Sequence, residues 1–233
     1  FLRAFCILYF GRMIILIKAV LFDLDGTLID TNNLIIQSFK YTLNKHLGKC
    51  PDDKEITSHF GEPLIKTMEN YDNEKKDLLF KTYLEYNAKV HDELIRGFKG
   101  VNEALENLKN NNIKLAVVTS KRKELAVREL KMFNLYDYFN TVVALEDTDR
   151  KKPFGDPAIK ACELLDVYPQ ESIMVGDSHF DILCGRNGGC KTCLVKYTVM
   201  DINSVMTYEP DYVVDDLGEI FNIIVKNDKV SAN

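Results

Sequence analysis

Short apolar runs alternate with helical patterns through the second half of the chain. Each run has the length of a strand buried on both faces, and the stretches between them carry apolar residues at intervals of three and four. Because strands that alternate with helices over short loops form a parallel sheet covered on both faces, this half predicts an α/β fold. The expected strands are 114–118, 141–145, 172–175, 192–195 and 212–214, and the expected helices are 101–110, 123–133, 157–165 and 181–187.

An earlier apolar run, residues 14–22, is broken only by Lys18 and ends in two carboxylates, Asp23 and Asp25, before Gly26. We expect this run to join the same sheet, because a lone strand could not satisfy its backbone hydrogen bonds. A carboxylate that is buried without a partner costs several kcal/mol. The two acids should therefore meet a metal ion, a basic side chain or solvent.

Residues 31–97 differ from the rest, because they contain no convincing strand. Segments 31–47 and 77–90 carry apolar residues at helical spacing, which predicts an all-helical insertion after the first strand. Residues 1–12 are apolar but too short and interrupted for a membrane-spanning helix, and no small-residue cleavage site follows them. The expected organisation is an N-terminal extension at 1–12, a discontinuous core of 13–30 and 98–233, and a helical cap of 31–97.

The charge balance argues against two classes of partner. The 233 residues contain 30 Lys and Arg against 35 Asp and Glu, a net charge of −5, whereas nucleic acid and acidic membranes reward a basic face. The overall charge does not exclude a local basic pocket. Cys190 and Cys193 form a CxxC pair with no second pair and no nearby histidine, which makes a poor zinc site. We expect reduced thiols and a cytoplasmic setting.

Polar residues follow several of the expected strands. In an open parallel sheet, ligands bind outside the carboxyl ends of the strands, so these residues should share one edge. Asp23 and Asp25 follow the first strand, Thr119 and Ser120 the second, and Asp177 the fourth, while Asp181 lies four residues further on and Lys152 precedes a helix.

This set suits phosphate chemistry. Asp23, Asp25 and Asp177 offer the oxygen ligands that Mg²⁺ prefers. The two hydroxyl groups could hydrogen-bond phosphoryl oxygens together with N–H groups at a helix start, and the lysine would neutralise remaining charge. A carboxylate could then attack phosphorus. Taken singly, each residue also fits a helix cap or a solvated surface position.

Four segments occur in the order of the four motifs of the haloacid dehalogenase superfamily, which the chain resembles over roughly residues 13–226. They are DLDGT at 23–27, VTS at 118–120, KP at 152–153 and GDSHFD at 176–181. The phosphoglycolate phosphatases and the inorganic pyrophosphatases of this superfamily look most similar, and the latter are the nearer match. The resemblance implies a Rossmann-like three-layer core with a central parallel sheet and a helical C1 cap inserted after the first strand.

The resemblance also implies roles for the acids. Asp23 would be the nucleophile and a Mg²⁺ ligand. Asp25 would be the general acid/base, with its backbone carbonyl on the metal. Asp177 would be an acidic metal ligand, and Asp181 would act behind it or through water.

The remaining motif residues would hold the phosphoryl group. Thr119 would bind it with help from Ser120, and Lys152 would bridge nucleophile and phosphate. In the cap, His59 and Lys66 could meet an anionic substrate, although a surface position fits them equally well. The third motif departs from the family pattern, because Gly155 stands where a second proline is usual.

The resemblance therefore implies a Mg²⁺-dependent phosphohydrolase that acts through an aspartyl phosphate on pyrophosphate or a small phosphorylated metabolite such as phosphoglycolate. A phosphomutase of the β-phosphoglucomutase kind uses the same aspartates and remains an alternative. Asp25 disfavours a dehalogenase, which needs no acid/base there. A receiver-like phosphoacceptor would lack the helical insertion. Nothing in the sequence indicates the oligomeric state.

Overall fold

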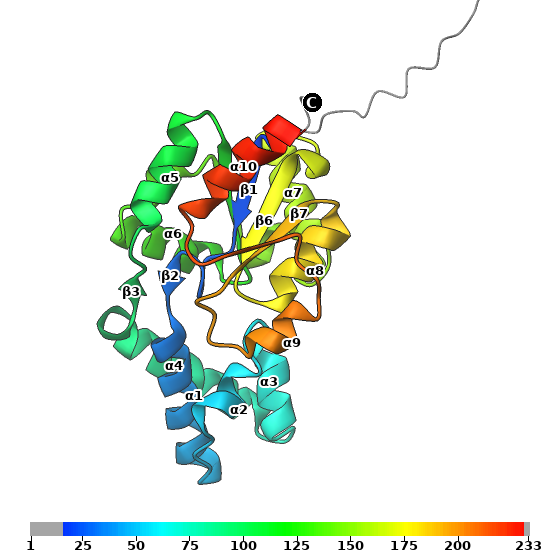
Figure 1. Cartoon of the computed structure of the whole chain (residues 1–233). Coiled ribbons are helices and arrows are strands. Elements are labelled where there is room, and N and C mark those ends of the chain that lie inside the picture. Colours follow the sequence, from blue (N-terminus) through cyan, green and yellow to red (C-terminus); the bar gives the residue numbers. More distant parts are fainter. Residues whose placement is uncertain (1–15, 231–233) are drawn as a thin grey trace, which may run out of the picture.

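One six-stranded parallel sheet forms the centre of the molecule, as a computed structural model that describes residues 16–230 shows (Figure 1). Strand β1 lies between β4 and β6, so its backbone is hydrogen-bonded on both sides. The predicted parallel α/β core is confirmed. In sheet order the strands are β5 (Thr141–Val143), β4 (Lys114–Val118), β1 (Ala19–Phe22), β6 (Ser172–Gly176), β7 (Lys191–Val195) and β8 (Tyr212–Val214).

Helices cover both faces of this sheet (Figure 1). Alternate residues of β1 point to opposite faces: Val20 and Phe22 pack into one apolar cluster, Ala19 and Leu21 into the other. The first cluster contains residues of α5 (Val101–Asn110), α6 (Lys123–Met132) and α10 (Glu219–Val230), and the second contains residues of α7 (Asp156–Leu165) and α8 (His179–Gly188).

Four helices lie between two very short strands, β2 (Ile29–Asp30) and β3 (Arg96–Gly97). These strands pair antiparallel, so the chain leaves the sheet and returns to it at one place. The helices bury an apolar cluster of their own around Phe39, Met68 and Tyr83. They are α1 (Asn32–Leu47), α2 (Asp53–Thr57), α3 (Leu64–Tyr71) and α4 (Lys76–Leu94).

The remaining elements are short. They are the 3₁₀ helices η1 (Tyr136–Tyr138), η2 (Leu145–Asp147) and η3 (Pro169–Glu171), and helix α9 (Ile202–Met206). Within residues 16–230, no helix has both the length and the apolar character needed to cross a membrane. The cysteines of this range are free thiols.

Two predicted strands are longer than the observed ones. Strand β1 begins at Ala19, because its neighbours β4 and β6 supply ladder partners only from that position. Leu16 is 45 % exposed, and residues 14 and 15 of the predicted strand and the extension at 1–12 lie outside the described residues. Strand β5 ends at Val143, because the Asp147 carboxylate accepts a hydrogen bond from the Ala144 N–H and turns the chain into η2.

Candidate active site

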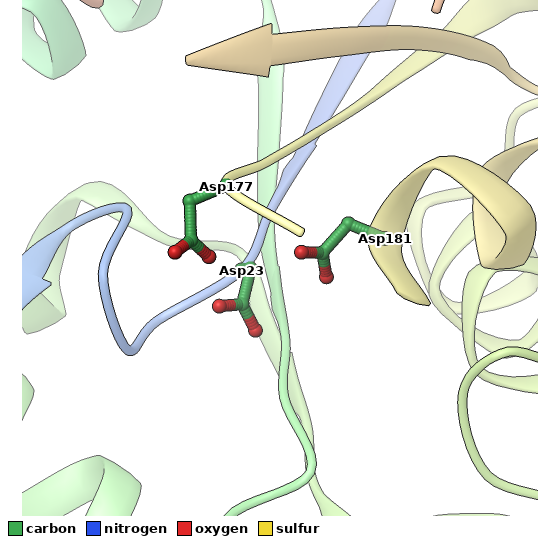
Figure 2. Close-up of side chains that lie close together, drawn as sticks. All are labelled: Asp23, Asp177 and Asp181. Atoms are coloured by element: carbon green, nitrogen blue, oxygen red, sulfur yellow. The ribbon is translucent and has the colours of Figure 1, made fainter. Parts of the chain in front are cut away.

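Three buried carboxylates meet at the carboxyl ends of β1 and β6 (Figure 2). Asp23 directly follows β1, Asp177 directly follows β6, and Asp181 lies in the first turn of α8. Each of the three carboxylates has one oxygen atom such that these three oxygens all lie within 4.8 Å of one another. Because β1 and β6 are parallel neighbours, their carboxyl ends deliver the first two acids side by side. Among the side chains that the structure describes, those of residues 16–226, no other group of three His, Cys, Asp or Glu has this geometry.

Lys152 holds two of these acids. Its Nζ lies 2.6 Å from Asp23 Oδ1 and 2.6 Å from Asp181 Oδ1, and the lysine is itself buried. The other oxygen of Asp181 accepts hydrogen bonds from the backbone N–H and the hydroxyl of Ser178, at 3.1 and 2.6 Å. Both oxygens of Asp181 are therefore engaged by protein groups.

The cluster carries more acid than base. Burial raises the pKa of Asp23 to about 7, with Asp181 adding to the rise and Lys152 opposing it. Burial, with Asp181 and Asp23 adding to it, also raises the pKa of Asp177 well above its usual value. Burial opposes the charge on Lys152, but Asp181 and Asp23 outweigh it and raise the pKa of that ammonium.

The donor set fits a hard divalent cation. The side chains of Asp23, Asp177 and Asp181 present only carboxylate oxygens, which Mg²⁺ prefers over nitrogen or sulfur ligands. A cation at this position would offset the excess of negative charge and favour the ionised carboxylates. The three buried acids therefore have the ligand chemistry to hold a divalent cation.

Asp25 points to a different set of partners. Its Oδ1 accepts hydrogen bonds from Thr31 Oγ1 at 2.7 Å and from Lys121 Nζ at 2.6 Å. Lys121 is not among the site residues expected from the sequence. The available signal was its place two residues after Thr119, in the loop that follows β4.

The two predicted hydroxyl residues also follow β4. The register pairs Phe22 with Val117, so the loops after β1 and β4 leave the sheet side by side. Thr119 is buried and its hydroxyl accepts a hydrogen bond from the Lys121 N–H at 3.1 Å. Ser120 is exposed. The structure thus brings Thr119 to the predicted edge of the sheet.

The cap reaches this edge through the loop between α2 and α3. Gly61 lies so close to Phe180 that an added Cβ would be 2.4 Å from Phe180 Cδ2, and Phe180 is the neighbour of Asp181. His59, in the same loop, has its Nδ1 3.3 Å from Glu62 Oε2. Lys66 is exposed. The loop therefore packs against the first turn of α8, although His59 is directed to Glu62.

Gly26 allows the loop after β1 to pass Asp177. Its φ is +81°, and a Cβ there would lie 2.5 Å from Asp177 Oδ2. A side chain in the left-handed region costs about 1–2 kcal/mol by itself. We therefore expect Gly26→Ala to lower the free energy of unfolding by more than that, as measured by urea denaturation.

Gly48→Ala is the matched control, because Gly48 has a φ of +62° but no atom within 4 Å of an added Cβ. It should show the backbone cost alone. Equal losses for the two variants would show that the approach to Asp177 does not constrain position 26.

The comparisons with known proteins agree with this geometry. The protein-family model of the haloacid dehalogenase-like hydrolases matches residues 20–195. A protein named "Putative pyrophosphatase PpaX" from Caldanaerobacter subterraneus subsp. tengcongensis is 48 % identical over 208 residues, which cover 89 % of this chain and 94 % of that protein. A pyrophosphatase PpaX from Bacillus mycoides is 38 % identical over 208 residues, with 89 % and 97 % covered.

A solved structure is also similar. A haloacid dehalogenase-like family hydrolase from Streptococcus pneumoniae superimposes with a TM-score of 0.80 at 25 % identity, and the match covers 89 % of this chain and 98 % of that one. Sequence and fold therefore point to the same group of enzymes.

Proposed function

The chain belongs to the haloacid dehalogenase-like hydrolase family, as a phosphatase of that family, and we propose that it hydrolyses pyrophosphate or a small phosphorylated metabolite such as phosphoglycolate. One observation carries the proposal: the Asp23 carboxylate, at the end of β1, is held by Lys152 within a buried group of acids. The name of the PpaX relatives supports pyrophosphate as the first substrate to test.

In the proposed reaction, an Asp23 oxygen attacks phosphorus while the bond from phosphorus to the leaving oxygen breaks. Asp25 gives its proton to that oxygen. It then takes a proton from water, which attacks phosphorus and releases phosphate and free Asp23. Asp25 lies two residues beyond the nucleophile and has Lys121 and Thr31 on one oxygen, which supports its separate role.

Other residues orient the reacting groups. Mg²⁺, held by Asp23, Asp177 and the Asp25 carbonyl, would neutralise charge on the transferring phosphoryl group. Lys152 would bridge Asp23 and that group, and Thr119 would hydrogen-bond it with help from Ser120. Because both oxygens of Asp181 already accept hydrogen bonds, we propose that Asp181 does not bind the metal directly.

The cap would admit the substrate and exclude bulk water, with His59 and Lys66 as candidate contacts for its anionic end. We propose a small phosphorylated compound or pyrophosphate as the partner. A cytoplasmic location and the absence of nucleic-acid and membrane partners stay predictions from composition. The boundaries of the cap at 31 and 97 also stay a proposal, supported by the pairing of β2 with β3.

A substrate panel tests the proposal. Purified protein with Mg²⁺ should release phosphate from pyrophosphate, phosphoglycolate or a common sugar phosphate without a sugar bisphosphate activator. Asp23→Asn should abolish release, although the protein still unfolds cooperatively in urea. Isomerised sugar phosphate in place of free phosphate would instead establish the phosphomutase alternative, and no turnover of any compound would contradict both.

Metal dependence gives a second test. We expect EDTA to stop phosphate release and Mg²⁺ to restore it, because the buried acids need a cation to offset their charge. Mg²⁺ should also raise the melting temperature of the wild-type protein, since binding to the native state stabilises it.

Asp177→Asn should lose most of that rise, whereas the control Asp149→Asn, at an exposed position, should keep it. A melting temperature that does not change when Mg²⁺ is added, together with activity in EDTA, would show that the reaction does not need the metal.

A further inference from the structure

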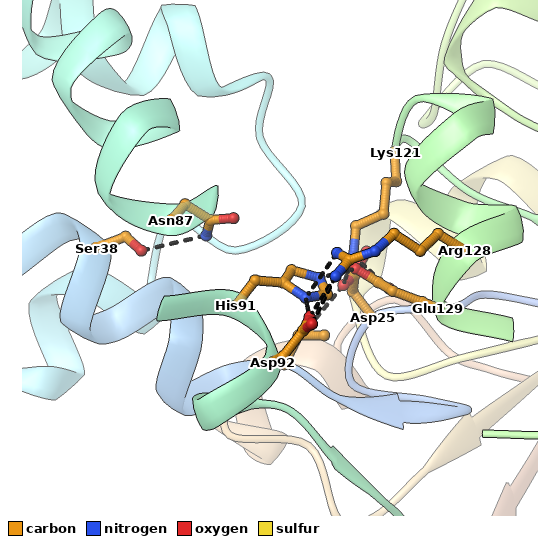
Figure 3. Close-up of polar contacts among 9 residues, drawn as sticks. Asp25, Ser38, Asn87, His91, Asp92, Lys121, Arg128 and Glu129 are labelled. Atoms are coloured by element: carbon orange, nitrogen blue, oxygen red, sulfur yellow. Dashed lines mark hydrogen bonds and ion pairs between the residues drawn. The ribbon is translucent and has the colours of Figure 1, made fainter. Parts of the chain in front are cut away.

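A fourth acid, Glu129, is buried outside the carboxylate cluster. Its side chain is 1 % exposed and lies on α6, the helix that follows the Thr119 loop. Its oxygens lie 2.5 and 2.7 Å from Lys121 Nζ, and Oε1 is 2.7 Å from His91 Nε2 (Figure 3). A buried carboxylate is tolerated only where such partners compensate the loss of water. We call Lys121, Glu129 and His91 the Glu129 array.

One end of the array meets the proposed acid/base. Lys121 Nζ, held by both oxygens of Glu129, lies 2.6 Å from Asp25 Oδ1. A lysine carries about 2 kcal/mol of rotamer entropy, so a free Lys121 would visit many geometries. Two short contacts to a buried carboxylate select the geometry in which the ammonium reaches Asp25.

The other end belongs to the cap. His91 lies in the last turn of α4, which leads into β3 and back to the core. Its Nδ1 is 2.7 Å from Asp92 Oδ1, and Asp92 is also bound by Arg128 of α6 at 2.6 Å. The hydrogen bond to Glu129, followed by the one to Asp92, raises the pKa of His91 against the effects of burial and Lys121.

We propose that Glu129 is a positioning residue for the reaction, which fixes Lys121 against Asp25 and ties that arrangement to the end of α4 through His91. The proposal rests on the proposed function, because it assigns Glu129 an effect through the acid/base. Glu129 does not touch the substrate. Its loss should slow proton transfer at Asp25 without weakening substrate binding.

A double-mutant cycle tests this. Glu129→Gln should lower kcat by about 10- to 10²-fold, since a small misplacement of a reacting group costs up to about 10²-fold, while KM stays within about twofold. In an Asp25→Asn background, measured by single turnover with excess enzyme, Glu129→Gln should cause almost no further loss, because the group through which it acts is gone. The control is Glu124→Gln, an exposed position on the same helix, which should be silent in both backgrounds.

An equal loss in both backgrounds, or no loss in the first, overturns the proposal. Lys121→Met replaces Glu129→Gln in the cycle if the latter does not fold, as judged by urea denaturation. Wild-type turnover of a panel substrate is measured first, so failure of the proposed function is seen separately.

Two variants of His91 test its contact with Glu129 separately. His91→Gln keeps an amide that can donate to Glu129, so it should retain most of the wild-type kcat. His91→Ala should lose turnover without a rise in KM. Equal kcat values for the two variants would show that His91 takes no part in holding Glu129.

Discussion

The position of the Lys152 ammonium between Asp23 and Asp181, 2.6 Å from an oxygen of each, is the interaction on which the site depends. Three acids buried at one sheet edge repel one another, and a single buried cation compensates only part of that repulsion. The remaining negative charge is the physical reason why we propose a metal ion at this site and, with it, an anionic substrate. Loss of the lysine would leave uncompensated buried charge, so fold and chemistry share this contact.

The fold supplies the geometry that this contact needs. Parallel pairing of β1 with β4 and β6 places the ends of these strands together, and the short loops after them carry Asp23, Thr119 and Asp177. The antiparallel pair of β2 and β3 returns the cap to the same region. Polar contacts then connect the cap, through His91 of α4 and Glu129 of α6, to Lys121 and so to Asp25, the residue that we propose as the acid/base.

Local pattern predicts much of this structure. Strands β4 and β8 and helix α5 have the bounds that apolar spacing indicates, because each is a short, strongly patterned element. The start of β1 depends on where its neighbours begin, and the short helices α2 and α3 have too few turns for a clear period. The burial of Glu129 follows from its position three residues after buried Ala126, on the inward face of α6. Its partner His91 comes from a distant element, which spacing cannot supply.

The most direct test of the central claim is a search for phosphate bound covalently to Asp23. Asp25→Asn should slow both the formation and the hydrolysis of the aspartyl phosphate, because the group that protonates the leaving oxygen and activates water is gone, and a general acid/base contributes about 10²–10⁴-fold. Acid quenching during turnover of the best panel substrate, followed by peptide mass spectrometry, should find phosphate on the peptide that contains Asp23. An Asp25→Asn protein that turns over at the wild-type rate, or one that never carries phosphate on that peptide, would contradict the account.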